Sequence, residues 1–288
     1  MRNIFTLTRP HQYVKNLFIF LPLFFAGQLT DLELLLNVCT SFVAFSVTAS
    51  AIYILNDFQD IEEDRKHPKK KCRPLAQGNV SKKNALFLMG ILFLVGISLM
   101  AKVSLPALFI LSIYIVLNIC YSFYLKHISI LDVTIVAIGF VLRLFVGSKV
   151  TEIQLSTWLV TMTFLLALFI ALAKRRDDVY LFLKTGTKMR QVIGSYNLKF
   201  TDGMMIVLAS AVIVTYILYT TSIEIIQRMQ SEYLYLTSLF VILGFMRYLQ
   251  LAFVENDCSS PTMILLKDKF MLLTMLAWTF TFALIIYH

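Results

Sequence analysis

The chain has 288 residues, of which 58% are hydrophobic and 15% are charged, and it carries a net charge of +9. A soluble domain is nearer half apolar and a quarter charged, so this composition excludes an ordinary soluble protein. Apolar runs long enough to cross a bilayer recur along the whole chain. The composition therefore predicts an all-α polytopic membrane protein, folded as a single domain over residues 1–288.

Nine apolar segments are predicted to form transmembrane helices. They are expected at residues 14–30, 33–56, 84–102, 104–125, 129–148, 154–173, 203–223, 233–254 and 269–287. The first segment is the weakest of the nine, because Pro22 interrupts it and Lys15 flanks it.

The basic residues are distributed unevenly between the predicted loops. If the N-terminus is inside, the outer segments hold only Lys102, Lys149 and Arg228, and nearly all other lysines and arginines fall in inner segments. This bias is what the positive-inside rule predicts for an inner N-terminus and an outer C-terminus. We therefore expect an integral protein of a bacterial inner (cytoplasmic) membrane, whose positive charge orients it in the lipid bilayer and requires no nucleic acid as a partner.

Two of the predicted inner loops, at residues 57–83 and 174–202, are long and polar, whereas the other connections are short. Long ordered loops often carry function. Because the two loops follow the second and sixth spans, they suggest two related halves that meet over one cavity.

The first inner loop opens with three aspartates, Asp57, Asp60 and Asp64, preceded by Asn56. Spacings of three and four residues put the three carboxylates on one face of a helix. Carboxylates this close repel one another unless a cation lies between them, and Mg²⁺ bound to a diphosphate suits such a site. The alternative is a solvated acidic end of a helix.

Basic residues follow the aspartates closely in the same loop. Arg73 offers a planar fork for phosphate oxygens, and Lys70 offers a point charge. An acidic cluster followed by a basic cluster suits a metal–diphosphate group, since the cations collect the oxygens that the metal leaves free. The alternative is that these lysines only fix the orientation of the chain in the membrane.

One pattern in this loop resembles the first Asp-rich motif of the UbiA superfamily of intramembrane prenyltransferases. It reads Asn56-Asp57-x-x-Asp60-x-x-x-Asp64, followed by Arg73-Pro74 and Gly78. The nine spans and the two inner loops are similar to that family along nearly the whole chain. The resemblance implies a UbiA-like ring of helices around a central cavity. It also implies that the three aspartates are catalytic and hold Mg²⁺, with Asn56 assisting.

Within that superfamily, three stretches most resemble the decaprenyl-phosphate phosphoribosyltransferase branch. They lie at residues 9–16, 67–78 and 131–147. The most branch-specific of them reads Arg9-Pro10-His11-Gln12-Tyr13-Val14-Lys15-Asn16. The resemblance makes Lys15 and Asn16 candidate substrate-binding residues.

The second inner loop lacks the aspartates four residues apart with which ordinary prenyltransferases of this superfamily hold a second magnesium. It has adjacent aspartates, Asp177 and Asp178, which point about 100° apart on a helix. Lys174, Arg175 and Asp178 instead resemble the Lys-Arg-x-x-acid pattern of the phosphoribosyltransferases, with an Asp where a Glu is typical. These cations suit a pocket that holds additional phosphate. The alternative is a basic cap on the inner end of the sixth span.

Five further residues complete the predicted substrate site. Arg190 and Tyr196 match the phosphoribosyltransferase pattern farther along the second loop. The stretch from Tyr121 to Lys126 resembles a Tyr-to-Lys element of the family, one residue longer than usual, whose lysine faces the donor phosphates. Arg143 lies deep within the fifth span, where an unpaired cation is costly, so a contact with substrate phosphate and a structural pairing are both open.

Taken with this resemblance, the sequence predicts a glycosyltransferase enzyme. It would transfer 5-phosphoribose from 5-phosphoribosyl 1-diphosphate to a polyprenyl phosphate, with Mg²⁺ as cofactor, at the cytoplasmic face of the membrane. The alternative within the superfamily is a prenyltransferase that moves an isoprenoid from its diphosphate to an aromatic acceptor. A third hypothesis is a transporter or lipid-binding membrane protein without catalysis.

Overall fold

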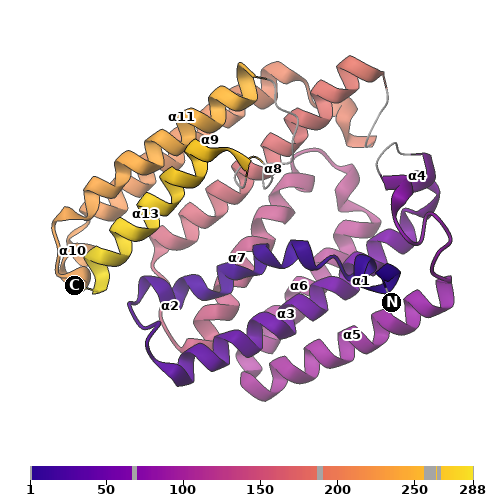
Figure 1. Cartoon of the computed structure of the whole chain (residues 1–288), viewed down its shortest axis with the longest axis horizontal. Helices are drawn as coiled ribbons and strands as arrows, with labels where there is room; N and C mark the ends of the chain where they lie inside the picture. Colours follow the sequence, from indigo (N-terminus) through magenta and orange to yellow (C-terminus); the bar gives the residue numbers. More distant parts are fainter. Residues whose placement is uncertain (1, 67–69, 187–190, 256–263, 265–266, 288) are drawn as a thin grey trace. The chain divides into compact units, whose positions relative to one another are not determined.

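The computed structural model describes residues 2–66, 70–186, 191–255, 264 and 267–287. Within these residues the chain is helical and contains no β-strand, which confirms the all-α prediction. The contacts divide the chain into two compact units, Met1–Leu155 and Ser156–His288. In Figure 1 the helices of the first unit run from indigo to mauve and those of the second from pink to yellow.

The first unit contains α-helices and short 3₁₀ helices, the latter labelled η. They are α1 (Arg2–Thr8), η1 (Pro10–Phe20), α2 (Leu21–Phe25), α3 (Leu32–Gln59), α4 (Ile61–Lys66), η2 (Lys70–Cys72), α5 (Lys82–Val103), α6 (Leu105–Phe123), η3 (Leu125–His127) and α7 (Leu131–Thr151).

The second unit is built in the same way from longer α-helices joined by short helical segments. They are α8 (Thr157–Thr185), η4 (Gln191–Ser195), α9 (Leu198–Thr221), α10 (Ile223–Met229), η5 (Tyr233–Thr237), α11 (Ser238–Phe253) and α13 (Lys269–Tyr287).

Seven helical segments of the described chain are long and apolar enough to cross a membrane. They are α3, α5, α6, α7, α8, α9 and η5 joined with α11. A shorter apolar helix, Lys269–Ile285 within α13, lies where the ninth span was predicted, and η1 with α2 lies where the first was predicted. The described helices are therefore compatible with the prediction of nine spans.

The first predicted span differs from the others because it is not one regular α-helix. Pro10 and Pro22 lie in the first turns of η1 and α2, where the missing N–H of proline costs no hydrogen bond. α7 packs closely against η1 at Gly147, since a Cβ atom on this residue would collide with the carbonyl oxygen of Ile19. A glycine in α7 therefore makes room for the irregular segment.

The helix α3 is the centre of the first unit. Asp31 caps its N-terminus by accepting hydrogen bonds from the backbone N–H groups of Glu33 and Leu34, at 3.0 and 3.1 Å. α3 lies alongside α5 (Figure 1), and Gly96 of α5 permits the close approach because a Cβ atom there would collide with Thr48. α3 also contacts α6 and α7, so three long helices of the first unit pack against it.

Several helices of the first unit are apolar on their outer faces as well as in the core. Phe87 and Leu94 of α5 are exposed, as are Phe109 and Val116 of α6. A helix that is hydrophobic all round belongs in a large core or in a membrane. The outward faces of α5 and α6 suit contact with lipid hydrocarbon.

In the second unit, α8 packs against α9, and α11 packs against α13. The hydroxyl of Tyr216 on α9 shares a hydrogen bond with Thr237 Oγ1 and accepts one from Trp278 Nε1 of α13, each at 2.7 Å. Phe169 of α8 meets Phe245 of α11 edge to face, with ring centroids 5.1 Å apart. Phe169, Phe245 and Trp278 are among the residues that line an apolar cavity of about 270 Å³ between α8, α11 and α13.

Candidate functional site

The three aspartates of the first motif lie where α3 gives way to the short helix α4. α3 ends at Gln59, and Asp60 adopts φ −90° and ψ 12° before α4 begins at Ile61. Hydrogen bonds from Asp60 N to Asn56 O (3.0 Å) and from Asp64 N to Asp60 O (2.7 Å) carry the helical path across this break. The predicted common face is only partly correct, because Asp60 is the irregular residue and its carboxylate takes a different partner from the other two.

Asp57 and Asp64 converge on the same guanidinium group. Arg73 Nη1 lies 3.0 Å from Asp57 Oδ1 and 2.6 Å from Asp64 Oδ2. Both aspartates are almost completely buried, at 2% and 1% exposure. Lys70 Nζ lies 3.9 Å from Asp64 Oδ1, the second oxygen of that carboxylate. Because buried carboxylates are costly without a counter-charge, the pairing with Arg73 compensates both of them.

Arg9 brings a second guanidinium group to Asp57, with which it forms an ion pair. It reaches the site from the turn between α1 and η1, and its guanidinium carbon lies 5.3 Å from the centre of the Tyr53 ring. Burial lowers the pKa of Arg9 below its ordinary value, and the charge of Asp57 opposes this shift. Arg9 belongs to the branch-specific stretch, but only its position in the fold places it in this site.

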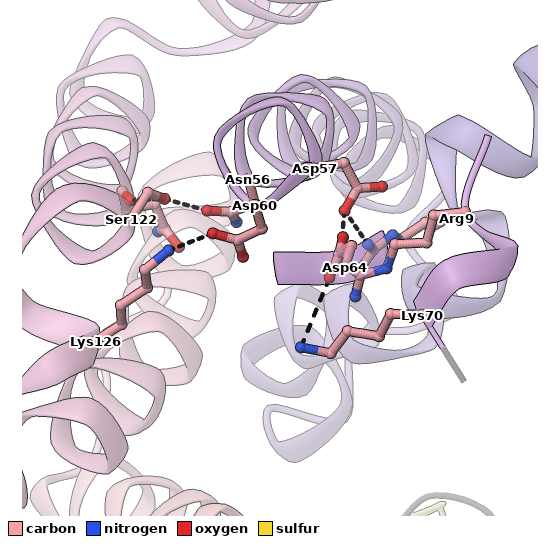
Figure 2. A network of polar contacts seen from close by, with 10 residues as sticks. Arg9, Asn56, Asp57, Asp60, Asp64, Lys70, Ser122 and Lys126 are labelled. Carbon is pink, nitrogen blue, oxygen red and sulfur yellow. Dashed lines mark hydrogen bonds and ion pairs between the residues drawn. The ribbon is translucent and has the colours of Figure 1, made fainter. Parts of the chain in front are cut away.

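Asp60 and Asn56 face the end of α6 and the following η3 helix. Lys126 Nζ lies 2.6 Å from Asp60 Oδ1, and the Ser122 hydroxyl donates to the amide oxygen of Asn56. Figure 2 shows Lys126 and Ser122 on one side of the site and Asp57 and Asp64 on the other, together with Arg9 and Lys70. The structure therefore brings the predicted lysine of the Tyr-to-Lys element to the aspartates.

The side chains of this site fit Mg²⁺ by their chemistry. Mg²⁺ prefers oxygen ligands and takes one or two carboxylates, which Asp57, Asp60 and Asp64 supply together with the amide oxygen of Asn56. One of these oxygens, Asp64 Oδ1, is buried and has no hydrogen-bond partner. The carboxylates are nevertheless turned toward cations of the chain. Among the described residues, no group of three or more His, Cys, Asp or Glu side chains is gathered closely enough to hold a metal ion.

Arg143 of α7 is 5% exposed and is surrounded by neutral partners. Its Nε donates to Asn16 Oδ1 (2.8 Å), its Nη1 to the carbonyl oxygen of Gly139 (2.6 Å) and its Nη2 to the Tyr114 hydroxyl (3.1 Å). The guanidinium carbon also lies 4.8 Å from the centre of the Phe45 ring. Of the two roles that the sequence leaves open, these contacts favour a structural pairing.

The pairing with Arg143 fixes the segment that carries the predicted residues Lys15 and Asn16. Asn16 is 1% exposed, and its Nδ2 donates to Ser46 Oγ of α3 at 2.8 Å. Lys15 is half-buried and lies within electrostatic range of Arg143 and Arg9. Tyr121, the first residue of the Tyr-to-Lys element, is half-buried on α6.

In the second unit, α8 continues to Thr185, so the first part of the predicted second inner loop is helical. Lys174 is exposed on this helix, whereas Arg175 is buried. Arg175 Nη1 lies 3.1 Å from Asp178 Oδ2, one turn farther along. The Lys-Arg-x-x-acid pattern is thus an ion pair on the last turns of a helix, beside an exposed lysine.

Sequence reasoning missed two residues of the second unit, Arg176 and Asp202, which link α8 to α9. Arg176 Nε lies 2.7 Å from Asp202 Oδ1, and its guanidinium carbon lies 5.2 Å from the centre of the Phe253 ring. No local spacing connects these residues, so only the fold reveals the pair. Of the remaining predicted residues, Tyr196 is buried just after η4, and Arg190 lies outside the described residues.

The outer faces of α5 and α6 are apolar, and a cluster of buried aspartates and partly exposed cations lies at the end of α3. These features define a class of membrane protein with a charged site at the end of its membrane-spanning helices. A family model described as the UbiA prenyltransferase family matches residues 16–262. The decaprenyl-phosphate phosphoribosyltransferase of Mycolicibacterium smegmatis is 30% identical over 97% of this chain and 91% of its own. That of Corynebacterium glutamicum is 30% identical over 97% of this chain and 85% of its own. The chain belongs to the UbiA prenyltransferase family, and it is an integral membrane protein and a transferase.

Solved structures share the fold of this chain. A UbiA homologue from Archaeoglobus fulgidus bound to DMAPP and Mg²⁺ superposes with a TM-score of 0.72 at 18% identity, over 96% of this chain and 98% of its own. A structure of digeranylgeranylglyceryl phosphate synthase gives a TM-score of 0.68 at 19% identity, over 100% of both chains. The predicted UbiA-like fold and the predicted resemblance are confirmed. Membership of a family of transferases removes the support for a transporter without catalysis.

Proposed function

We propose that the protein transfers 5-phosphoribose from 5-phosphoribosyl 1-diphosphate to a polyprenyl phosphate. The observation that carries this proposal lies on α8, where Asp178 is already engaged by Arg175 and Lys174 is exposed beside them. A prenyltransferase would need a second aspartate motif here, with two carboxylates on one face of the helix to bind a second metal ion. A transfer that brings a diphosphate, a sugar phosphate and a lipid phosphate together benefits instead from cations. The activity named for the relatives from Mycolicibacterium smegmatis and Corynebacterium glutamicum supports the same choice.

The first unit would bind the diphosphate of the donor. Asp57, Asp60 and Asp64, assisted by Asn56, would hold Mg²⁺, which when bound would neutralise charge on the leaving diphosphate. The fit of the oxygen donors and the open lone pairs of Asp64 Oδ1 support this assignment. The other residues proposed to contact the donor or the acceptor are Lys15, Asn16, Lys70, Arg73, Tyr121, Lys126, Lys174, Arg175, Asp178, Arg190 and Tyr196.

Arg143 would serve the same site through its neighbours. Its guanidinium group holds Asn16, and Asn16 in turn binds Ser46 of α3. Loss of Arg143 would therefore displace the segment that carries Lys15. We assign Arg143 a positioning role in substrate binding because its three donors meet protein acceptors.

The reaction needs little from the protein beyond positioning and charge compensation. An oxygen of the lipid phosphate, already an anion, would attack C1 of the ribose. The bond from C1 to the diphosphate oxygen would break as the new bond forms, and positive charge would develop at C1. Cations such as Arg73 and Lys126 would stabilise the departing diphosphate, and the closeness of the two substrates would supply much of the rate increase. The products would be polyprenyl-phosphoryl 5-phosphoribose and diphosphate.

The reaction would take place at the cytoplasmic face of a bacterial inner membrane, in a single domain with its N-terminus inside and its C-terminus outside. The excess of basic residues in the predicted inner segments supports this orientation. The soluble donor would be available on that side. The isoprenoid tail of the acceptor would remain in the hydrocarbon.

A prenyltransferase that moves an isoprenoid from its diphosphate to an aromatic acceptor is the second candidate. It is favoured by the shared fold with a homologue bound to DMAPP and Mg²⁺, and the first aspartate motif suits it equally well. The argument against this candidate is that α8 carries Lys174 and Arg175 where a second metal-binding aspartate motif would be needed.

One experiment separates the two candidates. Purified protein in lipid nanodiscs, with Mg²⁺, receives either isotope-labelled phosphoribosyl diphosphate with polyprenyl phosphate, or a prenyl diphosphate with an aromatic acceptor. Mass spectrometry of the lipid fraction is expected to find labelled phosphoribosyl lipid in the first reaction, and chelation of Mg²⁺ is expected to abolish it. Product formation only in the second reaction would overturn the proposal.

A further inference from the structure

The aspartates at the end of α3 are already neutralised by cations of the chain itself. Arg73 bridges Asp57 and Asp64, and Lys126 lies 2.6 Å from Asp60. These cations reach the site from segments that are separate in the sequence, η3 for Lys126 and the turn after η2 for Arg73. Figure 2 shows the Lys126 ammonium group directed at the Asp60 carboxylate.

Arg9 is the least expected of the cations, because its backbone adopts a conformation that its residue type disfavours. It has φ 51° and ψ 57°, in the left-handed region. An arginine is seldom found there, and such strain persists only where surrounding contacts enforce it. The contacts here are the ion pair with Asp57 and the face of the Tyr53 ring. A strained turn that delivers a guanidinium group to a buried aspartate suggests a function for that group.

A metal ion bound to these carboxylates would lie close to the cations that now pair with them. Charges of one sign a few ångströms apart repel strongly where water is largely excluded, and Asp57 and Asp64 are 2% and 1% exposed. The same cations become useful when a diphosphate arrives, since a diphosphate has more anionic oxygens than one metal ion can neutralise. Asp64 Oδ1, buried and without a hydrogen-bond partner, has lone pairs that a metal could take, and Lys70 Nζ lies 3.9 Å from it.

We propose that Arg9, Arg73 and Lys126 are exchange cations, which compensate the aspartates in the empty enzyme and turn to the diphosphate oxygens when a divalent metal takes their place. This inference rests on the proposed function and adds Arg9 to the residues that bind donor phosphate. The exchange keeps the buried charge compensated in both states. It also couples the two ligands, because metal binding releases the cations that the diphosphate needs.

Wild-type protein offers a direct test through the reactivity of Lys126. Lysine acetylation, quantified peptide by peptide by mass spectrometry, is measured in the metal-free protein, with Mg²⁺ alone and with Mg²⁺ plus inorganic diphosphate. Mg²⁺ alone is expected to raise the labelling rate of Lys126 about threefold or more, because the ammonium group leaves Asp60. Inorganic diphosphate is expected to lower the rate again. Unchanged labelling of Lys126 on addition of Mg²⁺ would overturn the exchange.

Two variants test the same exchange by binding. In Lys126→Met and in Arg9→Gln, calorimetry is expected to show Mg²⁺ bound about tenfold more tightly in the absence of diphosphate, since a competing cation is gone. Binding of inorganic diphosphate at saturating Mg²⁺ is expected to weaken about tenfold. A merely structural role would lower both affinities together, and that result would contradict the proposal.

The matched control is Lys83→Met, which makes the same change at an exposed lysine in the first turn of α5. It is expected to leave both affinities within about twofold of wild type. If wild type makes no phosphoribosyl lipid but Lys126 still responds to Mg²⁺ and diphosphate, the proposed function fails and the exchange stands. If wild type makes the product and Lys126 does not respond, the exchange alone fails.

Discussion

Two arginines in the first unit, the half-buried Arg73 and the buried Arg143, are held in opposite ways. Arg73 lies between two carboxylates, those of Asp57 and Asp64. Arg143 donates to an amide oxygen, a carbonyl oxygen and a hydroxyl group, and lies against aromatic rings. Neutral acceptors satisfy the hydrogen bonds of a guanidinium group, but they carry no negative charge that a metal ion could take over. The charge of the partners thus distinguishes a cation that can change partners from one that fastens the fold.

The largest effect is expected for Asp57→Asn, which removes one of the two carboxylates at Arg73. Transfer should fall by about 1,000-fold or more, or roughly 4 kcal/mol of transition-state stabilisation, because an amide cannot compensate a metal ion. The protein should still insert and fold, since Asp64 continues to pair with Arg73. Initial rates of phosphoribosyl-lipid formation measure the loss.

The control for this variant is Glu62→Gln on the neighbouring helix α4. The side chain of Glu62 is 75% exposed, and its partner Arg65 is 51% exposed. The rate should stay within about twofold of wild type, because exposed ion pairs contribute little. Near-wild-type activity of Asp57→Asn would remove the metal assignment and the basis for calling Arg73 exchangeable.

The next effect is on stability and concerns Arg143→Gln. Removing the guanidinium group leaves buried acceptors on Asn16, Gly139 and Tyr114 without their donors, so unfolding should become easier by about 2–4 kcal/mol. Thermal unfolding in detergent, followed by intrinsic fluorescence, measures the change.

Tyr114→Phe provides the matched comparison for Arg143, since it keeps the ring and removes only the hydroxyl at 3.1 Å from Arg143 Nη2. Its cost should be about 1 kcal/mol. If Arg143→Gln instead kept its stability and lost substrate binding, Arg143 would belong with Arg73 and the contrast between them would fail.

A smaller effect on activity is expected for Arg73→Lys, which keeps the charge and loses the fork. One nitrogen of Arg73, Nη1, already contacts both Asp57 and Asp64, so an ammonium group could keep much of this pairing, but it could not bind phosphate through two parallel hydrogen bonds. The KM for the phosphoribosyl donor should rise about tenfold, equivalent to ~1.4 kcal/mol, with little change in thermal stability. Steady-state kinetics with varied donor tests this, and a stability loss as large as that of Arg143→Gln would show that Arg73 is structural.

Sequence could predict the composition of the first site because its acids and bases are close together in the chain. The spacing of Asp57, Asp60 and Asp64 and the nearby Arg73 are local features. Their division into two sets was not predictable, because it depends on one irregular residue, Asp60, and on Lys126 arriving from η3. A prediction from helix periodicity assumes helical φ and ψ angles at every residue, and Asp60 does not have them.

The long apolar helices were predictable from hydropathy alone, whereas the irregular ones were not. η1 and α2 replace a regular first span because Pro22 and the close approach of α7 at Gly147 favour a broken segment. α8 runs beyond the predicted span to Thr185, and the lysines, arginines and leucines of this extension are good helix formers. The pairs Arg9–Asp57 and Arg176–Asp202 join distant segments, and no local pattern announces such contacts.

A third arginine, Arg247 of α11, sharpens the comparison because its carboxylate partners are more exposed than those of Arg73: the side chains of Asp268 and Glu255 are 16% and 48% exposed. Its Nη2 lies 2.8 Å from Asp268 Oδ2, and its Nη1 lies 3.0 Å from Glu255 Oε1. The hydrogen bond from Arg247 holds the pKa of Asp268 below its ordinary value. A carboxylate whose pKa is lowered in the folded protein stabilises the fold at any pH above its ordinary pKa, which is near 3.9. This stabilisation is lost as the pH falls through the lowered pKa of the folded state.

The smallest effect is therefore expected for Asp268→Asn, as a slightly lower unfolding temperature than wild type at pH 7. The difference should shrink as the pH falls below about 4, because wild type then loses the same charge. Thermal unfolding of both proteins between pH 7 and pH 3 measures it. A difference that stayed constant at low pH would mean that Asp268 acts as a neutral acceptor, as the partners of Arg143 do. A carboxylate partner alone would then not identify an arginine whose contacts depend on charge. What would still distinguish Arg73 from Arg143 is that both carboxylates at Arg73 are buried.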